Sequence, residues 1–194
     1  MQTKLTRWTP AHRAEETLLT NDPFWNLPVV PSFSLTSPDL DDGATLPQWA
    51  RSGIAGAGGD DRSPALQWSG APEGTKSFAL TMYDPDAPTG SGWWHWAVHG
   101  IPAETHEIAQ NAGDPDARLL PAGAVTLPNE IRLARYLGAA PPAGHGDHRY
   151  FFVLSALAVD HLDVPDDATP AYLGFVLRDH LLGRAVLQGV SRTE

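Results

Sequence analysis

Short runs of alternating or continuous apolar residues, separated by turn residues, predict a chain made mainly of β-strands. Residues 77–83 (SFALTMY) alternate with the period of two that is typical of a strand with one buried face, and residues 93–101 form a second such run. Residues 149–159 (RYFFVLSALAV) are apolar on both faces, which is typical of a central strand. Further short strands are expected at residues 32–36, 66–68 and 185–190.

One α-helix is expected in the last third of the chain. The hydroxyl of Thr169 can cap its first turn, and Pro170 suits the first helical position. Apolar residues then recur at helical spacing, and Gly183 is a candidate for the helix end. We therefore expect residues 170–182 to form a helix at the periphery of a β-rich domain.

The chain divides into a lead-in and one domain. Residues 1–31 are poorly patterned, and Pro23, Pro28 and Pro31 argue against regular structure there. Residues 32–194 are long enough for a single domain with its own core. The 18 glycines and 18 prolines lie between short apolar runs, so the expected fold is mostly β, an antiparallel β-sandwich-like domain with one or two peripheral helices.

Charge and composition exclude several classes of function. The net charge of −10 disfavours broad electrostatic binding to nucleic acid or anionic lipid, although a local pocket can still hold one anion. The absence of cysteine excludes disulfides, thiolate catalysis and cysteine-ligated zinc. The first residues lack the apolar core of a signal peptide, and no apolar run is long enough for a membrane span. We therefore expect a cytoplasmic protein with no nucleic-acid partner and no stable membrane insertion.

The eight histidines do not predict a metal site. His95 and His99 lie four residues apart in a predicted strand, which places them on one face but about 13 Å apart, too far to share an ion. His145 and His148 are separated by an odd number of residues and would face opposite sides of a strand, although a loop at His145 leaves another geometry open. We expect no metal and no cofactor.

Two short segments carry candidate chemistry. Asp84 and Asp86 follow a predicted strand directly, and the prolines between and after them restrict the backbone, so both carboxylates project from a rigid strand end. They could equally cap a turn by accepting backbone hydrogen bonds. His148 and Tyr150 lie two residues apart in a strand and share a face, whereas Arg149 faces the other way. This pair could form a polar pocket rim or could be ordinary core residues.

The order of the motifs resembles the phosphatidylethanolamine-binding protein family, and more narrowly its bacterial Raf-kinase-inhibitor-like branch. The resemblance extends over about residues 32 to 189, and DPDAP followed by HRY in this order is its most specific part. The matching motifs are Ser63-Pro64-x-Leu66-x-Trp68, Gly74-Thr75-Lys76-Ser77-Phe78, DPDAP at 84–88, Trp94-His95-Trp96 and Ala140-Pro141-Pro142-x-Gly144-His145-Gly146-x-His148-Arg149-Tyr150.

This resemblance implies a central antiparallel sheet packed against a smaller one, with peripheral helices. It also implies a pocket for phosphate, acetate or a phosphorylated headgroup. Carried over by motif, the residues expected to bind the ligand are Asp84, Asp86, His95, His148 and Tyr150, with Pro88, Ala140, Pro141 and Pro142 as lining.

Two segments depart from the family pattern. Relatives often have Gly-Pro-Cys-Pro-Pro or Gly-Pro-Pro where this chain has Gly138-Ala139-Ala140-Pro141-Pro142, which leaves the backbone less freedom near an anion. Many bacterial relatives have Gly-Thr-Tyr where this chain has Gly189-Val190-Ser191. A tyrosine contact at that point is therefore in doubt.

Three functions are consistent with these residues. The first is the binding, without catalysis, of a small anionic or zwitterionic ligand such as phosphoethanolamine, because His and Tyr can donate to an anion while Asp can accept from an ammonium. The second, from the family resemblance, is inhibition of a kinase or protease through protein contact. The third is a hydrolase or lyase with Asp84 as base and His95 or His148 as acid. The chain has no G-x-S-x-G, P-loop or HExxH motif, which favours binding.

The tryptophans raise the possibility of a homodimer. Seven are more than most cores of this size need, so an aromatic patch could serve a dimer interface, although ordinary core packing is favoured for Trp68 and Trp94. The seven are Trp8, Trp25, Trp49, Trp68, Trp93, Trp94 and Trp96.

Overall fold

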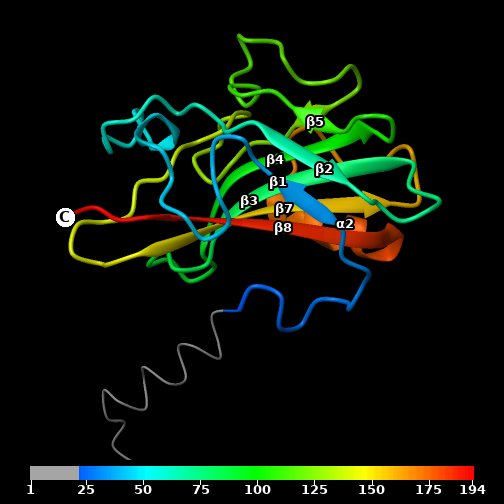
Figure 1. Ribbon diagram of the computed structural model, residues 1–194, viewed down its shortest axis with the longest axis horizontal. Helices are drawn as coiled ribbons and strands as arrows, with labels where there is room; N and C mark the ends of the chain where they lie inside the picture. The colour runs from blue at the N-terminus through cyan, green and yellow to red at the C-terminus, as the bar shows by residue number, and fades with distance from the viewer. Residues whose placement is uncertain (1–21) are drawn as a thin grey trace, which may run out of the picture.

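The computed structural model describes residues 22–194, which form two antiparallel sheets, one short α-helix and long connecting loops (Figure 1). Most of the predicted lead-in, Trp8 included, lies outside the described residues, so the boundary near residue 31 stays a prediction. No helix in the described part of the chain is long and apolar enough to cross a membrane.

A five-stranded sheet organises the molecule, in the order β6-β4-β3-β7-β8. Every neighbouring pair is antiparallel, and β3 is the central strand. Strand β7 is buried on both faces, as its apolar sequence predicts, and the first half of β3 is also buried on both faces, although its alternation predicts one buried face. The strands are β3 (Ser77–Asp84), β4 (Trp93–Pro102), β6 (Val125–Thr126), β7 (His148–Leu157) and β8 (Leu181–Ser191).

A smaller sheet covers one face of the large one, which we call the inner face. It has the order β1-β2-β5, formed by β1 (Ser34–Thr36), β2 (Leu66–Ser69) and β5 (Glu107–Ile108). Figure 1 shows these short strands lying over β3, β4, β7 and β8. Buried residues from both sheets form one core, which includes Leu35, Leu66, Trp68, Phe78, Leu80, Trp96, Tyr150, Phe152 and Leu154.

The opposite, outer face of the large sheet is only partly covered. The helix α2 (Pro170–Leu177) packs there, and Leu173 joins Ala79, Ala97 and Leu157 in a second buried cluster. Thr169 caps this helix by accepting a hydrogen bond from the Tyr172 amide at 3.2 Å, as predicted. A 3₁₀ turn, η2 (Arg178–His180), joins the helix to β8; a second such turn, η1 (Gln48–Ala50), lies in the first long loop.

The fold class and the main strands are confirmed, but the helix is shorter than predicted. It ends at Leu177, and Gly183 lies in β8 rather than at a helix end. Gly183 pairs with Ala156 in the ladder, and a Cβ at this glycine would come within 2.7 Å of Pro72. A close approach between segments, rather than a helix cap, therefore explains this glycine.

A β-bulge in β4 changes which way its side chains face. Met82 pairs with Trp96 and Tyr83 with Trp94, so His95 is an extra residue in the ladder. His95 and Trp96 consequently both face inward: the His95 ring contacts Tyr150, and Trp96 lies in the shared core. His99 faces outward, since its neighbour Val98 belongs to the inner core. The prediction that His95 and His99 share a face is therefore wrong.

Candidate functional site

An acid–imidazole pair lies where β3 and β7 meet at one end of the large sheet. Asp84 is the last residue of β3 and His148 the first of β7, and both side chains face inward. The His148 Nδ1 lies 2.8 Å from Asp84 Oδ2, and the two side chains are only 2% and 4% exposed. A carboxylate can only accept here, so Nδ1 carries the hydrogen and Nε2 is left for another partner.

Tyr150 is the next inward-facing residue of β7 and lies beside this pair. Its ring meets the His95 ring edge-on, with centroids 5.1 Å apart. The hydroxyl is buried and has no hydrogen-bond partner among the described residues. Burial, followed by the negative charge of Asp84, raises the pKa of Tyr150, so the phenol keeps its proton at neutral pH. Tyr150 therefore offers a donor that makes no hydrogen bond of ordinary length and angle among the described residues, although Asp84 lies near enough for a side-chain hydrogen bond to contribute to the raised pKa.

His95 completes the cluster as a neutral group. Its Nδ1 lies 2.9 Å from the carbonyl oxygen of Leu137, so this nitrogen donates. Burial lowers the pKa of His95, and the opposing effects of the Leu137 carbonyl and the Asp84 charge do not compensate. The neutral ring then presents Nε2 as an acceptor, which suits an ammonium or hydroxyl group rather than an oxyanion.

The structure does not bring Asp86 to the inner side. Its carboxylate accepts from Arg149 Nε and Nη2, each at 2.7 Å, and from the Arg149 amide at 3.0 Å. The Asp86 amide in turn donates to Asp84 Oδ1 at 2.8 Å. Thus Asp84 contacts the histidine on one side of the sheet while Asp86 anchors the turn to Arg149 on the other.

The four predicted lining residues differ in exposure. Pro141 is buried and Ala140 half-buried, whereas Pro88 and Pro142 are exposed. The segment before them is tied to β4 by the Leu137 amide, which donates to the His95 carbonyl at 3.0 Å. Hydrogen bonds to His95 therefore fix the position of the loop at residues 137–141 relative to β4.

Asp61 is a buried carboxylate that the sequence reading missed. It accepts from the amides of Gly138, Ile54 and Gly53 at 2.7, 2.8 and 2.9 Å. Burial alone would raise the pKa of Asp61, but these donors outweigh it and the pKa is lowered. A Cβ at Gly138 would lie 2.3 Å from the Arg51 carbonyl carbon, so this glycine permits the close packing of the two loops.

Arg51 was also missed, and it places a cation beside the cluster. Its Nη2 donates to Thr193 Oγ1 at 2.8 Å, and its buried Nε has no partner among the described residues. Arg51 forms an isolated bridge with Ala139, and its positive charge counteracts the rise in the pKa of Tyr150. The only signal in the sequence was a basic residue in a Gly-rich acidic segment, which by itself indicates nothing.

Two further features bear on chemistry. Ser191 pairs with His148 in the β7–β8 ladder, on the side away from Asp84. His145 lies in a turn, with its ring centroid 5.8 Å from that of His148. Within residues 22–194 no group of three His, Asp or Glu side chains is placed to hold a metal ion.

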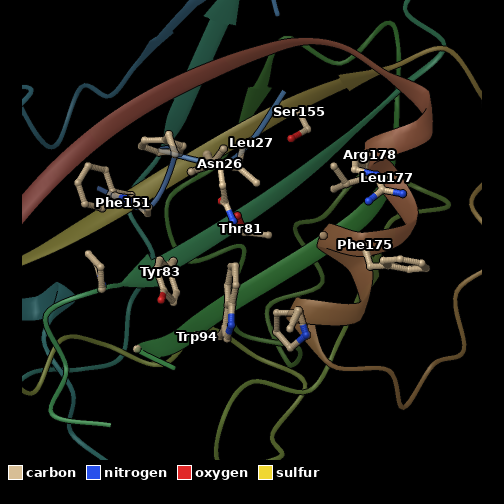
Figure 2. Close-up of a pocket in the computed structure, with 18 of the residues that line it drawn as sticks. Asn26, Leu27, Thr81, Tyr83, Trp94, Phe151, Ser155, Phe175, Leu177 and Arg178 are labelled. Carbon is tan, nitrogen blue, oxygen red and sulfur yellow. The ribbon is translucent and has the colours of Figure 1, made fainter. Parts of the chain in front are cut away.

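The structure also contains a groove of about 680 Å³, but it lies on the outer face of the sheet (Figure 2). Tyr83, Trp94 and Phe151 line it, and none of the nine predicted site residues does. The cluster around His148 and this groove are thus separate features on opposite faces of the same sheet.

Comparisons with known proteins agree with this architecture. The sequence model of the phosphatidylethanolamine-binding protein family matches residues 36–192. The UPF0098 protein YbcL of Escherichia coli (strain K12) is 42% identical over 159 residues, which are 82% of this chain and 87% of YbcL. The UPF0098 protein YbhB of the same organism is 44% identical over 151 residues, which are 78% of this chain and 94% of YbhB.

Solved structures share the fold. The crystal structure of E. coli YbcL, described as a new member of the mammalian PEBP family, matches with a TM-score of 0.81 and 40% identity over 84% of this chain and 99% of that one. The phosphatidylethanolamine-binding protein from Plasmodium vivax matches with a TM-score of 0.58 at 19% identity, covering 93% and 95% of the two chains. The chain therefore belongs to the phosphatidylethanolamine-binding protein family.

Proposed function

We propose that this protein binds a small oxyanion, phosphate or a phosphorylated headgroup, in the cluster formed by Asp84, His95, His148 and Tyr150. The observation that carries the proposal is the Tyr150 hydroxyl, which is buried, keeps its proton at neutral pH and makes no hydrogen bond of ordinary length and angle among the described residues. A buried donor without a partner costs about 1–3 kcal/mol, and a ligand oxygen would recover that cost.

Charges around the cluster support an anion despite the presence of Asp84. Arg51 contributes a permanent positive charge, and its buried Nε is a second unused donor. A proton on His148 would balance Asp84 and turn Nε2 into a further donor toward the ligand. His95 offers an acceptor, so a zwitterion such as phosphoethanolamine would find groups of both kinds.

Phosphate titration followed by calorimetry tests this function. Removing the hydroxyl in Tyr150→Phe should weaken phosphate binding about 10-fold, which corresponds to about 1.4 kcal/mol. The matched control is Tyr172→Phe, which changes an exposed tyrosine of α2 and should leave the affinity unchanged. Absence of phosphate binding by the unaltered protein, or equal affinity in both variants, would contradict the proposal.

Catalysis by the same residues is the second candidate, because Ser191, His148 and Asp84 lie on three neighbouring strands in that order. Enzymes that transfer acyl groups use a serine hydroxyl, a histidine and a carboxylate that lie next to one another in this order in space. However, no side-chain hydrogen bond joins the Ser191 hydroxyl to the His148 ring among the described contacts, which favours binding. Hydrolysis of p-nitrophenyl acetate or phosphate that is lost in both Ser191→Ala and His148→Ala would establish the catalytic alternative.

A further inference from the structure

The groove on the outer face of the large sheet has the features of a second ligand site. Its floor consists of outward-facing strand residues, Thr81, Tyr83, Trp94, Phe151 and Val153. Residues 22–28 form one wall, and α2 closes one end (Figure 2). Its volume of about 680 Å³ is within the range of pockets that hold drug-sized molecules, roughly 300–1,000 Å³.

Aromatic rings gather at one end of this groove. Tyr83 and Trp94 pack with centroids 4.4 Å apart, and Phe24 meets Phe151 edge-on at 5.5 Å. Both Tyr83 and Trp94 are only half-buried, and Trp25 on the wall is 71% exposed. Partly exposed aromatic rings in a concave site favour a planar aromatic ligand.

A guanidinium without an acidic partner lies beside these rings. Arg184 pairs across the ladder with Ser155, and both line the groove. The nearest interactions of Arg184 are a 3.4 Å hydrogen bond to the Pro28 carbonyl and the Phe24 ring, 5.8 Å from its Cζ. Among the described residues no carboxylate lies within ion-pair distance of Arg184, and burial lowers its pKa. A half-buried cation of this kind favours an anionic partner.

The other charged residues of the lining are already engaged. Arg178 donates to Asp179 at 3.2 Å, and Asp22, the one acidic residue of the lining, accepts from the Phe24 amide at 2.9 Å. In a chain with a net charge of −10, this groove is therefore a local site where a negative group meets an unneutralised positive one.

We infer that the groove binds a small molecule with a planar aromatic body and one anionic group, a carboxylate, sulfonate or phosphate. The aromatic body lies against Tyr83, Trp94 and Phe151, and the anionic group reaches Arg184. The Phe24 ring lies 5.5 Å from that of Phe151 and 5.8 Å from Arg184 Cζ, so a ligand with one or two rings on the floor can place its anionic group at the guanidinium. This inference is independent of the proposed phosphate site on the inner face.

Two fluorescent probes with the same body test the inference. 1-Anilinonaphthalene-8-sulfonate carries a sulfonate, whereas N-phenyl-1-naphthylamine is its uncharged counterpart. We expect the sulfonate to bind the full chain with one-to-one stoichiometry and about 10-fold more tightly in the unaltered protein than in Arg184→Gln. The uncharged probe should bind both proteins equally, and Arg184→Lys should restore part of the sulfonate affinity.

Variants at other sites define the location. Phe151→Ala should weaken both probes, because it removes part of the floor. Arg192→Gln removes an exposed arginine outside the groove, and His148→Ala alters the inner-face cluster; neither should change probe binding. Thermal midpoints of all variants show whether each is folded. Equal sulfonate affinity in Arg184→Gln and Arg192→Gln, or no saturable binding by the unaltered protein, would overturn the inference.

Discussion

Two aspartates of one turn contact residues on opposite faces of the large sheet. Asp84 and Asp86 come from the same DPDAP motif, yet one contacts His148 on the inner side and the other holds Arg149 on the outer side. The turn-cap interpretation is confirmed for Asp84, which accepts the Asp86 amide, whereas the ligand-binding role of both aspartates stays a prediction. A sequence pattern can place a carboxylate at a strand end, but its partner depends on the neighbouring strand.

The Asp61 carboxylate should be the most sensitive polar residue in the loops behind the site. Asp61→Asn replaces one acceptor oxygen with an amide donor, so at least one of the three backbone donors loses its partner. We expect a loss of about 1–3 kcal/mol in unfolding free energy, measured by urea denaturation at pH 7. Asp60→Asn, at an exposed neighbour, should have little effect.

The pH dependence of that variant has a defined sign. The folded pKa of Asp61 is lowered from about 3.8, so its contribution is complete above pH 3.8 and is lost as the pH falls through the lower folded value. Asp61→Asn should therefore show a smaller loss of stability below pH 4 than the unaltered protein. If the unfolding free energy of Asp61→Asn depends on pH below 4 as that of the unaltered protein does, Asp61 does not cause the loss of stability in acid.

Arg51 should matter for anion affinity rather than for folding. Arg51→Gln removes the only permanent positive charge described next to Tyr150, and phosphate affinity should fall about 10-fold in calorimetry. Arg62→Gln removes one charge at the surface and controls for the change in net charge. If both variants lose affinity equally, the effect is one of overall charge and Arg51 has no specific role.

At the scale of elements, the strands could be predicted and the bulge could not. Alternation is a local property of the sequence, so residues 77–83 and 149–159 were identified from their own side chains. The extra residue at His95 exists only relative to β3, and no pattern within β4 shows it. The contacts of the loops that carry Asp61 and Arg51 could not be predicted either, because composition indicates a loop but not the distant segment that the loop contacts.

Strand β7 begins at the proposed binding site and continues through the core, so variants at its two parts should affect binding and stability separately. Leu154→Ala creates a cavity in the shared core and should cost about 2–5 kcal/mol, with a clear drop in thermal midpoint. His148→Ala lies at the start of the same strand and should abolish phosphate binding with a smaller change in midpoint. Loss of folding in His148→Ala, with binding per folded molecule intact, would make His148 a core residue.

For the whole molecule, two buried histidines should make the unfolding free energy depend on pH below neutrality. Burial lowers the pKa of His95 and of His99, and neither ring nitrogen of His99 has a hydrogen-bond partner among the described residues. The groups that face His99 electrostatically are His161, which also lowers its pKa, and Asp166, which raises it. In the unfolded chain both histidines would titrate near pH 6.5.

Stability should therefore be complete above about pH 6.5 and should fall as the pH drops toward the lower folded pKa values, because unfolding takes up protons there. Urea midpoints at pH 7.5 and 5.0 measure this loss. His99→Leu should reduce the proton uptake on unfolding by up to about one proton. A variant with the same pH dependence as the unaltered protein would show that His99 does not contribute.

The two acid–base pairs at the end of β3 and β7 also have a dynamic consequence. The Asp84–His148 pair closes this end on the inner face, and the Asp86–Arg149 pair closes it on the outer face. Strand ends are normally the first parts of a sheet to fray. Here fraying would have to break both pairs together, so backbone amides near Asp84 and Tyr150 should exchange hydrogen as slowly as those at the centre of the sheet. The groups proposed to bind the ligand would then keep their positions even without it.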